Sequence, residues 1–414
     1  MRAEIIFYII FAIFIVEFIF TKIIDYLNTL NWSNELPKEL ENIYDKEKYK
    51  KSMKYEKIKY YFYLFSWIFN FFIIFFVLAF WLFWYLDIFV RQFSDNDMIL
   101  SLYFFWIIFV FQTIINIPFS YYFTFVIEER FWFNKTTKKL FTIDKIKWFF
   151  LTIIISWSLL SLIVRTYSIY SEMFRIYAWI IVTLFSIFMI MFYSSLIVPL
   201  FNKQTSLEKW KLRDEIEKFS KKVWFKLDNI YVIDWSKRSS KANAYFSGIG
   251  PKKRIVLYDT LIKDLTISEL VSVLAHEIWH YKKKHTLQML IFSIIQTWFI
   301  LFLFSIFLKY EVFSQALWAK NGSFWIGAVA FSILFTPISI VLWLFGNILS
   351  RKNEYEADRF AWKHHDYKKL KSSLIKLSKN HLSNLRPHKI YEFFNYSHPA
   401  LLRRLKAMDE TFKK

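Results

Sequence analysis

Seven long apolar runs constrain the possible folds of this chain more than any other feature, because each approaches or exceeds the length that crosses a membrane. A helix rises about 1.5 Å per residue, so roughly 20 apolar residues cover a hydrocarbon core about 30 Å thick. The runs lie at residues 5–24, 61–90, 99–126, 148–165, 176–201, 287–308 and 324–349. The sequence therefore predicts an all-α, multi-pass membrane protein with about seven transmembrane helices.

The amino-acid composition agrees with a membrane location and indicates which kinds of partner the chain binds. Hydrophobic residues make up 56% of the chain and aromatic residues 22%, well above the values of soluble domains. The formal net charge is +21, but the basic residues flank the apolar runs, where they anchor spans at anionic headgroups. We therefore expect the lipid bilayer as a partner and no nucleic acid. The first run is interrupted by Glu17 and no small-residue cleavage site follows it, which favours a retained span over a signal peptide.

Basic residues alternate between the connections, which orients the spans. The connections within 25–60, 130–147, 202–286 and 350–414 are rich in lysine and arginine, whereas those between them have few. Because basic segments are retained on the cytoplasmic side, we expect an N-terminus outside and both large polar segments in the cytoplasm. The membrane would be the endoplasmic reticulum in a eukaryote, or the inner or plasma membrane in a bacterium.

These patterns divide the chain into four parts. We expect five spans with cytoplasmic loops in 1–201, a small α+β domain in 202–286, two spans in 287–349 and a cytoplasmic C-terminal part in 350–414. Within the second part, the sequence predicts an amphipathic helix at 207–225, a strand at 230–233, a hairpin at 243–259 and a helix that starts at a capping box of Thr266 and Glu269.

The capped helix contains the motif H-E-I-W-H, His276 to His280. Residues four apart lie on the same helix face, so His276 and His280 can both offer a ring nitrogen to one zinc ion. Glu277 then stands where it can activate a water molecule. The alternative is a pair of structural histidines beside a solvated glutamate. The chain has no cysteine, so any metal site must use histidine and carboxylate ligands.

A catalytic zinc needs a third protein ligand, and the segment N-E-Y-E-A-D, Asn353 to Asp358, offers one. We expect it at the start of a helix that follows the last span. Glu354 is the preferred ligand and Asp358 the acceptor for the other N–H of a ligand histidine. Glu356 competes with Glu354, and because the two point about 200° apart only one can face the metal. The segment could also be only a charged helix start.

The H-E-x-x-H motif, the downstream E-x-x-x-D and the spans together resemble the CAAX prenyl protease 1 family of integral membrane zinc metalloendopeptidases, and more distantly HtpX-type proteases. Further blocks resemble the same family: F-V-I-E-E-R at 125–130, S-K-R-S-S-K-A-N-A-Y-F at 236–246, R-I-V-L-Y-D-T-L at 254–261 and Y-S-H-P-A-L-L-R-R-L at 396–405. The resemblance implies helices that enclose an intramembrane chamber, capped by the zinc domain. It also implies one Zn²⁺ per chain and removal of the C-terminal tripeptide of prenylated CAAX proteins.

The resemblance assigns further roles by position. It implies that Asn243, Ala244 and Tyr245 form an edge along which an extended peptide substrate lies, that His398 stabilises the oxyanion, and that Arg404 supports the site or pairs with an acid. For His398 the alternative is a turn residue before proline, and for Arg404 a basic residue that faces phospholipid.

Several residues stand outside these assignments. His285, just past the metal helix, is expected at the surface. The acidic residues Glu17, Glu128 and Glu129 lie in or beside spans and are expected to face a water-filled chamber. Trp279 replaces the family's usual glycine, and Phe131 and Trp132 replace its usual His-Gly, which is expected to reshape the substrate chamber.

Three alternative functions remain open. The first is a quality-control protease of the same chemistry that clears damaged membrane proteins. The second is a transporter or channel with a structural zinc, and the third a catalytically dead scaffold. The absence of internal repeats and the complete set of His276, His280, Glu354 and Glu277 argue against the last two.

Overall fold

The computed structural model describes residues 2–41, 44–170, 172–208, 211–225, 229–248, 254–319 and 322–412. In this part of the chain, six helices are long and apolar enough to cross a membrane, and a bent pair makes a seventh candidate. These are α1 (Ala3–Thr29), α2 (Lys46–Ala79), α4 (Asp97–Tyr122) with the π-helical turn Phe123–Glu128, α5 (Lys138–Ile169), α6 (Phe174–Phe192) with the π-helical turn Tyr193–Ile197 and α7 (Val198–Phe201), α11 (His285–Leu308), and the pair α13 (Phe324–Leu334) and α14 (Thr336–His364). The predicted multi-pass helical fold is confirmed.

Two predicted spans are broken. The run at 61–90 ends as α2 at Ala79, and after Trp81, whose φ is 57°, a separate helix α3 (Leu82–Val90) begins. Asp87 of α3 is buried and accepts a hydrogen bond from Trp325 Nε1 at 2.8 Å, so this carboxylate is paired at the end of the bundle instead of facing lipid.

The last predicted span, 324–349, also bends. Helices α13 and α14 meet at an angle of 59° around Phe335. Pro337 in the first turn of α14 has no backbone N–H to continue the preceding helix, which accounts for the break. No further proline follows before His364, so α14 continues past the membrane run. The expectation that Asn353 to Asp358 begins a new helix is therefore wrong, because these residues lie inside α14.

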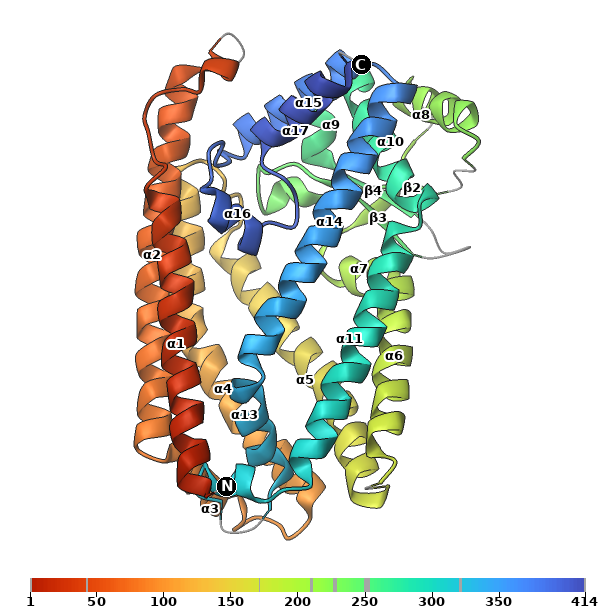
Figure 1. Cartoon of the computed structure of the whole chain (residues 1–414). Helices are drawn as coiled ribbons and strands as arrows, with labels where there is room; N and C mark the ends of the chain where they lie inside the picture. Colours follow the sequence, from red (N-terminus) through yellow and green to blue (C-terminus); the bar gives the residue numbers. More distant parts are fainter. Residues whose placement is uncertain are drawn as a thin grey trace.

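The polar segments gather at one end of the bundle, together with the C-terminus and opposite the N-terminus (Figure 1). They form a four-stranded sheet and short helices. The strands are β1 (Gln204–Ser206), β2 (Ile230–Ile233), β3 (Ala244–Ser247) and β4 (Arg254–Tyr258). The helices are α8 (Lys211–Lys222), α9 (Asp259–Asp264), α10 (Ile267–Lys282), α15 (Tyr367–Asn380), α16 (Lys389–Asn395) and α17 (Leu401–Phe412). A further short helix, α12 (Val312–Gln315), does not belong to this group and connects α11 to α13.

The sheet has the order β1-β2-β4-β3, in which β2 and β4 are parallel and the outer pairs antiparallel. The predicted hairpin corresponds to β3 and β4, with Ala244 opposite Leu257 and Ser247 opposite Arg254. Its turn, residues 249–253, lies outside the described residues. Among the described strands β3 pairs with β4 alone, so it is an edge strand.

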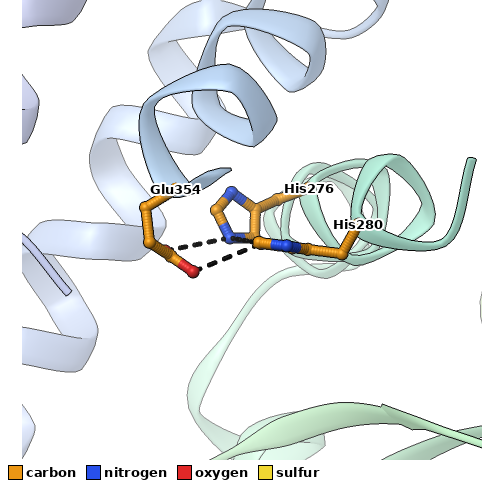
Figure 2. Close-up of side chains that lie close together, drawn as sticks. All are labelled: His276, His280 and Glu354. Atoms are coloured by element: carbon orange, nitrogen blue, oxygen red, sulfur yellow. Dashed lines mark hydrogen bonds and ion pairs between the residues drawn. The ribbon is translucent and has the colours of Figure 1, made fainter. Parts of the chain in front are cut away.

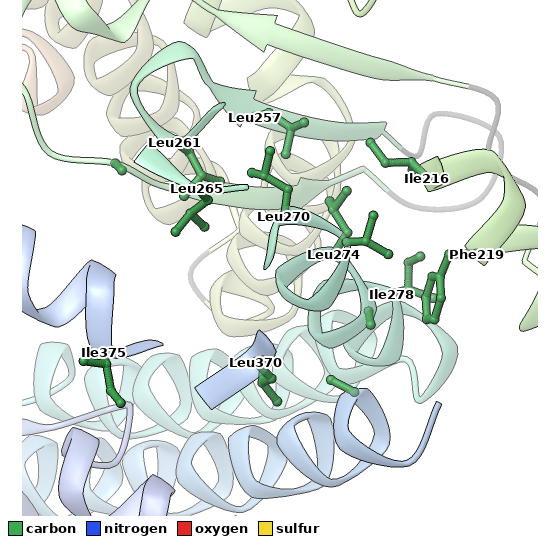
Figure 3. Close-up of a cluster of buried hydrophobic side chains, with 14 of the residues drawn as sticks. Ile216, Phe219, Leu257, Leu261, Leu265, Leu270, Leu274, Ile278, Leu370 and Ile375 are labelled. Atoms are coloured by element: carbon green, nitrogen blue, oxygen red, sulfur yellow. The ribbon is translucent and has the colours of Figure 1, made fainter. Parts of the chain in front are cut away.

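One hydrophobic core joins most of the polar segments (Figure 3). Leu270, Leu274 and Ile278 of α10 pack between the sheet, α8 and the C-terminal helices. The connection between the first two spans also belongs to this core, through Leu36, Leu40, Tyr44, Tyr49 and Met53. The protease part is therefore assembled from distant pieces of the chain, which the division by sequence did not show.

Candidate metal centre and active site

Helix α10 presents two histidines on one face. Its first turn is fixed by the predicted capping box, in which Thr266 and Glu269 bond each other's backbone N–H. The apolar residues of α10 point into the core. His276 and His280 lie one turn apart on a different side of the helix, and their Nε2 atoms are 3.1 Å from each other (Figure 2).

Helix α14 brings a carboxylate to the same point. Glu354 is buried, with Oε2 3.4 Å from His276 Nε2 and Oε1 3.3 Å from His280 Nε2 (Figure 2). One ligand atom from each of the three residues lies within 4.8 Å of the others. The residues that the sequence proposed as ligands therefore meet, and Glu356 does not join them.

Asp358 and Arg404 lie behind the cluster. Asp358 is one turn beyond Glu354, and its Oδ1 is 2.9 Å from His276 Nδ1, the ring nitrogen that points away from the cluster. Arg404 of α17 donates from Nε to Asp358 Oδ2 at 2.7 Å, and its Nη1 lies 3.7 Å from Glu354 Oε2. Arg404 therefore neutralises the buried Asp358, which is the acid-pairing role proposed for it.

The donor set fits a divalent cation. Two imidazole nitrogens and a carboxylate converge, and Glu354 Oε2 is buried with no hydrogen bond to any described residue. Burial opposes a charged imidazole, but the carboxylates of Glu354 and Asp358 outweigh it and raise the pKa of His276 to about 10. The site thus strongly attracts positive charge, as a metal site with a carboxylate ligand does.

A cavity of about 1410 Å³ opens beside this cluster. The residues that line it include Glu277, whose pKa is raised by burial even though the neighbouring His276 and His280 act in the opposite direction. A raised pKa makes a carboxylate a stronger base, as a residue that accepts a proton from water requires. The cavity also reaches side chains of the spans α6 and α11: Phe185, Ser186, Met189, Ile190, Met289, Leu290 and Ser293.

The edge strand lies along the same cavity. Asn243, Ala244 and Tyr245 all line it, and the outer edge of β3 pairs with no described strand. Such an edge offers backbone N–H and C=O groups to an extended peptide. That a substrate pairs with these three residues stays a prediction.

His398 reaches the cluster from the loop after α16. Its Nε2 lies 3.4 Å from Glu354 Oε1, and its side chain is 64% exposed, toward the cavity that it lines. Arg351 of α14 holds the start of this loop by donating to the carbonyl of Phe393 in α16 at 3.1 Å and to that of Tyr396 in the loop. Sequence reasoning missed Arg351. Its position one turn before Glu354 is the only hint of this role in the sequence.

The expected surface position of His285 is wrong. The side chain is 4% exposed, and its Nδ1 lies 3.0 Å from Nδ1 of His280. Helix α10 ends at Lys282, and α11 begins at His285 after Lys284, whose φ is 55°. This break between the two helices places His285 against His280. Glu356 lies on the same side, with Oε2 3.7 Å from His285 Nε2.

Glu17, Glu128 and Glu129 do not line this cavity, contrary to expectation. Glu128 pairs with Lys241 Nζ at 3.0 Å and accepts a hydrogen bond from Tyr55. Glu129 accepts one from Asn134 Nδ2 at 2.8 Å. Glu17 is bonded more weakly, with Thr21 Oγ1 at 3.4 Å. Each carboxylate is satisfied locally, so a water-filled environment is not needed to explain it.

The unusual aromatic residues also lie away from the cavity. Trp279 stacks on Phe360 of α14 with ring centroids 4.1 Å apart. Phe131 is buried against Tyr55, and Trp132 is 73% exposed. None of the three lines the cavity, so the expected reshaping of the chamber is not seen. Trp279 instead strengthens the packing of α10 on α14.

Spans, a His-His-Glu cluster and a half-buried glutamate beside a cavity are together typical of an integral membrane metalloprotease. Comparison with known proteins defines the family. Residues 25–203 match the model described as CAAX prenyl protease N-terminal, five membrane helices, and residues 206–412 match peptidase family M48.

Individual relatives agree with the family models. The chain is 34% identical to CAAX prenyl protease 1 of Saccharomyces cerevisiae, over 92% of this chain and 90% of that protein. It is 32% identical to the homologue of Mus musculus, over 91% and 89%. The crystal structure of S. mikatae Ste24p superposes with a TM-score of 0.92 at 32% identity and covers 99% of both chains. The chain therefore belongs to the CAAX prenyl protease 1 family, and it is a membrane metalloprotease.

Proposed function

We propose that the chain is a zinc metalloendopeptidase that binds one zinc per chain through His276 Nε2, His280 Nε2 and Glu354. The convergence of these three side chains at the wall of a cavity that also contains Glu277 carries the proposal. Two histidines and one glutamate leave a fourth position open, which is the ligand set of catalytic zinc sites in proteases.

When bound, zinc would lower the pKa of a water molecule and polarise the scissile carbonyl. The chain's own residues supply the remaining steps. Glu277 accepts the proton of the attacking water and delivers it to the leaving amine. His398 donates a hydrogen bond to the carbonyl oxygen as negative charge develops there. Asp358 Oδ1, 2.9 Å from His276 Nδ1, would accept the proton of Nδ1 and thereby keep the lone pair of Nε2 directed at the cluster.

The substrate we propose is a prenylated CAAX protein, from which the enzyme removes the C-terminal tripeptide. The relatives' names support this choice, and so does the cavity. An extended peptide paired with the edge at Asn243, Ala244 and Tyr245 would pass the His-His-Glu cluster. The apolar side chains of α6 and α11 on the cavity wall would contact the lipid group.

A peptide cleavage assay tests this function. A peptide that ends in a farnesylated cysteine and three further residues should release its tripeptide, and the same peptide without the farnesyl group should be cleaved far more slowly. Glu277→Gln should reduce cleavage about 10²- to 10⁴-fold while the metal stays bound. Equal cleavage of both peptides would favour the quality-control protease. Unchanged cleavage by Glu277→Gln would remove Glu277 from the mechanism.

We further propose that the end of the bundle with the sheet faces the cytoplasm and the N-terminus the opposite side. The basic connections around 25–60 and 130–147 and the segments 202–286 and 350–414 support this orientation, since basic segments are retained inside. Single cysteines at Lys237 and Lys389 test it, because the native chain has none. Both should react with an impermeant reagent only from the cytoplasmic side, and labelling from opposite sides would contradict the topology.

A further inference from the structure

His285 is the one histidine in contact with the cluster that the proposed mechanism does not use. It is the first residue of α11, on the side of His280 away from Glu354. The side chain is almost fully buried, and its two ring nitrogens face different polar groups. Nδ1 lies 3.0 Å from His280 Nδ1, and Nε2 lies 3.7 Å from Glu356 Oε2. A buried, polar side chain in this position needs an explanation.

The tautomers of the two histidines follow from the geometry. His280 points Nε2 at Glu354 Oε1, 3.3 Å away, so a metal bound there takes the lone pair of Nε2. The proton of neutral His280 then sits on Nδ1 and must be donated. The partner at 3.0 Å is His285 Nδ1, which can accept only if His285 carries its own proton on Nε2. That proton would lie on the side of the Glu356 carboxylate, which at 3.7 Å makes no hydrogen bond with Nε2 but whose negative charge favours this tautomer.

The two metal histidines are therefore supported in parallel ways. Behind His276 stands Asp358, itself paired with Arg404. Behind His280 stands His285, with Glu356 beyond it. Groups that accept the outer N–H of a metal-bound histidine fix its ring orientation and increase its basicity.

We propose that His285 is a positioning residue that accepts the Nδ1–H of His280 and holds this ring in the orientation that binds the metal, with Glu356 fixing the tautomer of His285. The proposal rests on the zinc site proposed above. It also gives Glu356 a role other than that of a ligand, and it explains why a histidine at the start of a span is buried against α10.

A matched pair of substitutions tests the proposal by metal affinity instead of activity. His285→Asn keeps an acceptor, because Asn Oδ1 lies as many bonds from the backbone as His Nδ1, whereas His285→Leu has the same branching without any acceptor. Zinc affinity is measured by competition with a chelating dye in detergent. We expect His285→Leu to bind zinc about 10- to 100-fold more weakly than the wild type, and His285→Asn to recover most of the loss.

Controls separate positioning from packing. His364→Leu removes an imidazole ring that stacks on Phe360 and whose Nδ1 bonds the Phe360 carbonyl of its own helix, so zinc affinity should not change. Thermal unfolding of the metal-free proteins should be the same for His285→Leu and His285→Asn. Equal zinc affinities for wild type and His285→Leu would overturn the proposal, and so would equal losses in the Leu and Asn variants.

A further variant covers the case in which His285→Leu does not fold. Glu356→Gln keeps the shape of a partly exposed side chain, and we expect it to weaken zinc binding about two- to fivefold. Unchanged affinity in that variant would then contradict the proposal. The failure of the proposed function looks different, because the wild type itself would then bind no zinc.

Discussion

Helices α10 and α14 supply the same cluster, but different forces position their ligands. The histidines of α10 are set by local rules: a capping box starts the helix, an apolar face enters one core, and spacing of four residues puts His276 beside His280. Glu354 lies about five turns into α14, counted from the bend at Phe335. Its direction depends on the length and phase of a helix that begins within the membrane run.

This difference shows that a single helix, α14, connects the membrane-spanning part of the chain to the metal site. Below Glu354, Asn347 and Arg351 bind the backbone at the end of α16, just before the loop with His398, and above it Asp358 pairs with Arg404 of α17. One helix therefore positions the third ligand and the C-terminal segments together. A rotation of α14 about its axis should therefore displace both Glu354 and the C-terminal segments that α14 contacts.

The largest effect is expected from a single alanine inserted between Ser350 and Arg351. The insertion rotates Glu354 by about 100° relative to the membrane part of α14 and advances it about 1.5 Å. We expect complete loss of bound zinc and of peptide cleavage, measured by metal analysis and by tripeptide release. The matched control is an alanine inserted after Asn34, in an exposed loop, which should leave both values unchanged.

If the variant with the alanine inserted in α14 kept its zinc, the proposed difference between α10 and α14 would be contradicted. The chain already has two π-helical turns, Phe123–Glu128 and Tyr193–Ile197, and each accommodates an extra residue in a helix. An α14 that absorbed the insertion in the same way would show that contacts around Glu354, and not the phase of the helix, fix its position.

A smaller effect is expected at Asp358. Asp358→Asn keeps an acceptor for His276 Nδ1 but removes the charge that pairs with Arg404. Zinc should bind about 10- to 100-fold more weakly, which competition with a chelator would measure. Asp366→Asn is the control, because Asp366 caps α15 and asparagine caps as well as aspartate. Equal zinc affinities of the two variants would mean that the charge behind His276 does not matter.

Sequence predicted the parts of this structure that follow from local periodicity. The spans, the strand at 230–233, the hairpin and the capped metal helix were all predicted because their patterns repeat over a few residues. The choice of Glu354 over Glu356 followed from the family resemblance and the helical period. Both agree with the distances in the structure.

The features that sequence missed depend on tertiary contacts. The bends at Trp81 and Phe335 occur inside continuous apolar runs, which hydropathy cannot divide. His285 was assigned to the surface because nothing in its sequence position shows that the break at Lys284 places it against His280. The segment from Leu36 to Met53 joins the protease core across more than a hundred residues, beyond the reach of any pattern.

The smallest effect concerns stability of α10 itself. Burial opposes ionisation of Glu269, but hydrogen bonds from Lys376, Ser372 and Thr266 outweigh it and lower its pKa from 4.5 to about 2. Stability from this carboxylate is therefore complete above pH 4.5 and is lost as the pH falls toward 2. Glu269→Gln should lower the free energy of unfolding by about 1–2 kcal/mol at neutral pH, with zinc still bound.

Chemical unfolding in detergent over a pH series measures this contribution. The difference between wild type and Glu269→Gln should shrink as the pH falls below 4.5, since the wild-type carboxylate then becomes neutral as well. A difference that stays constant with pH would show that the charge of Glu269 contributes nothing, and that only its shape supports the start of α10.

The central claim is that His276, His280 and Glu354 together hold one metal ion, and metal analysis of the purified protein tests it most directly. Zinc per chain is measured after dialysis for the wild type and for Glu354→Ala, with Glu356→Ala as the matched control. We predict about one zinc in the wild type and in Glu356→Ala, and almost none in Glu354→Ala. A wild type without stoichiometric zinc, or a Glu354→Ala protein that keeps it while Glu356→Ala loses it, would contradict the account.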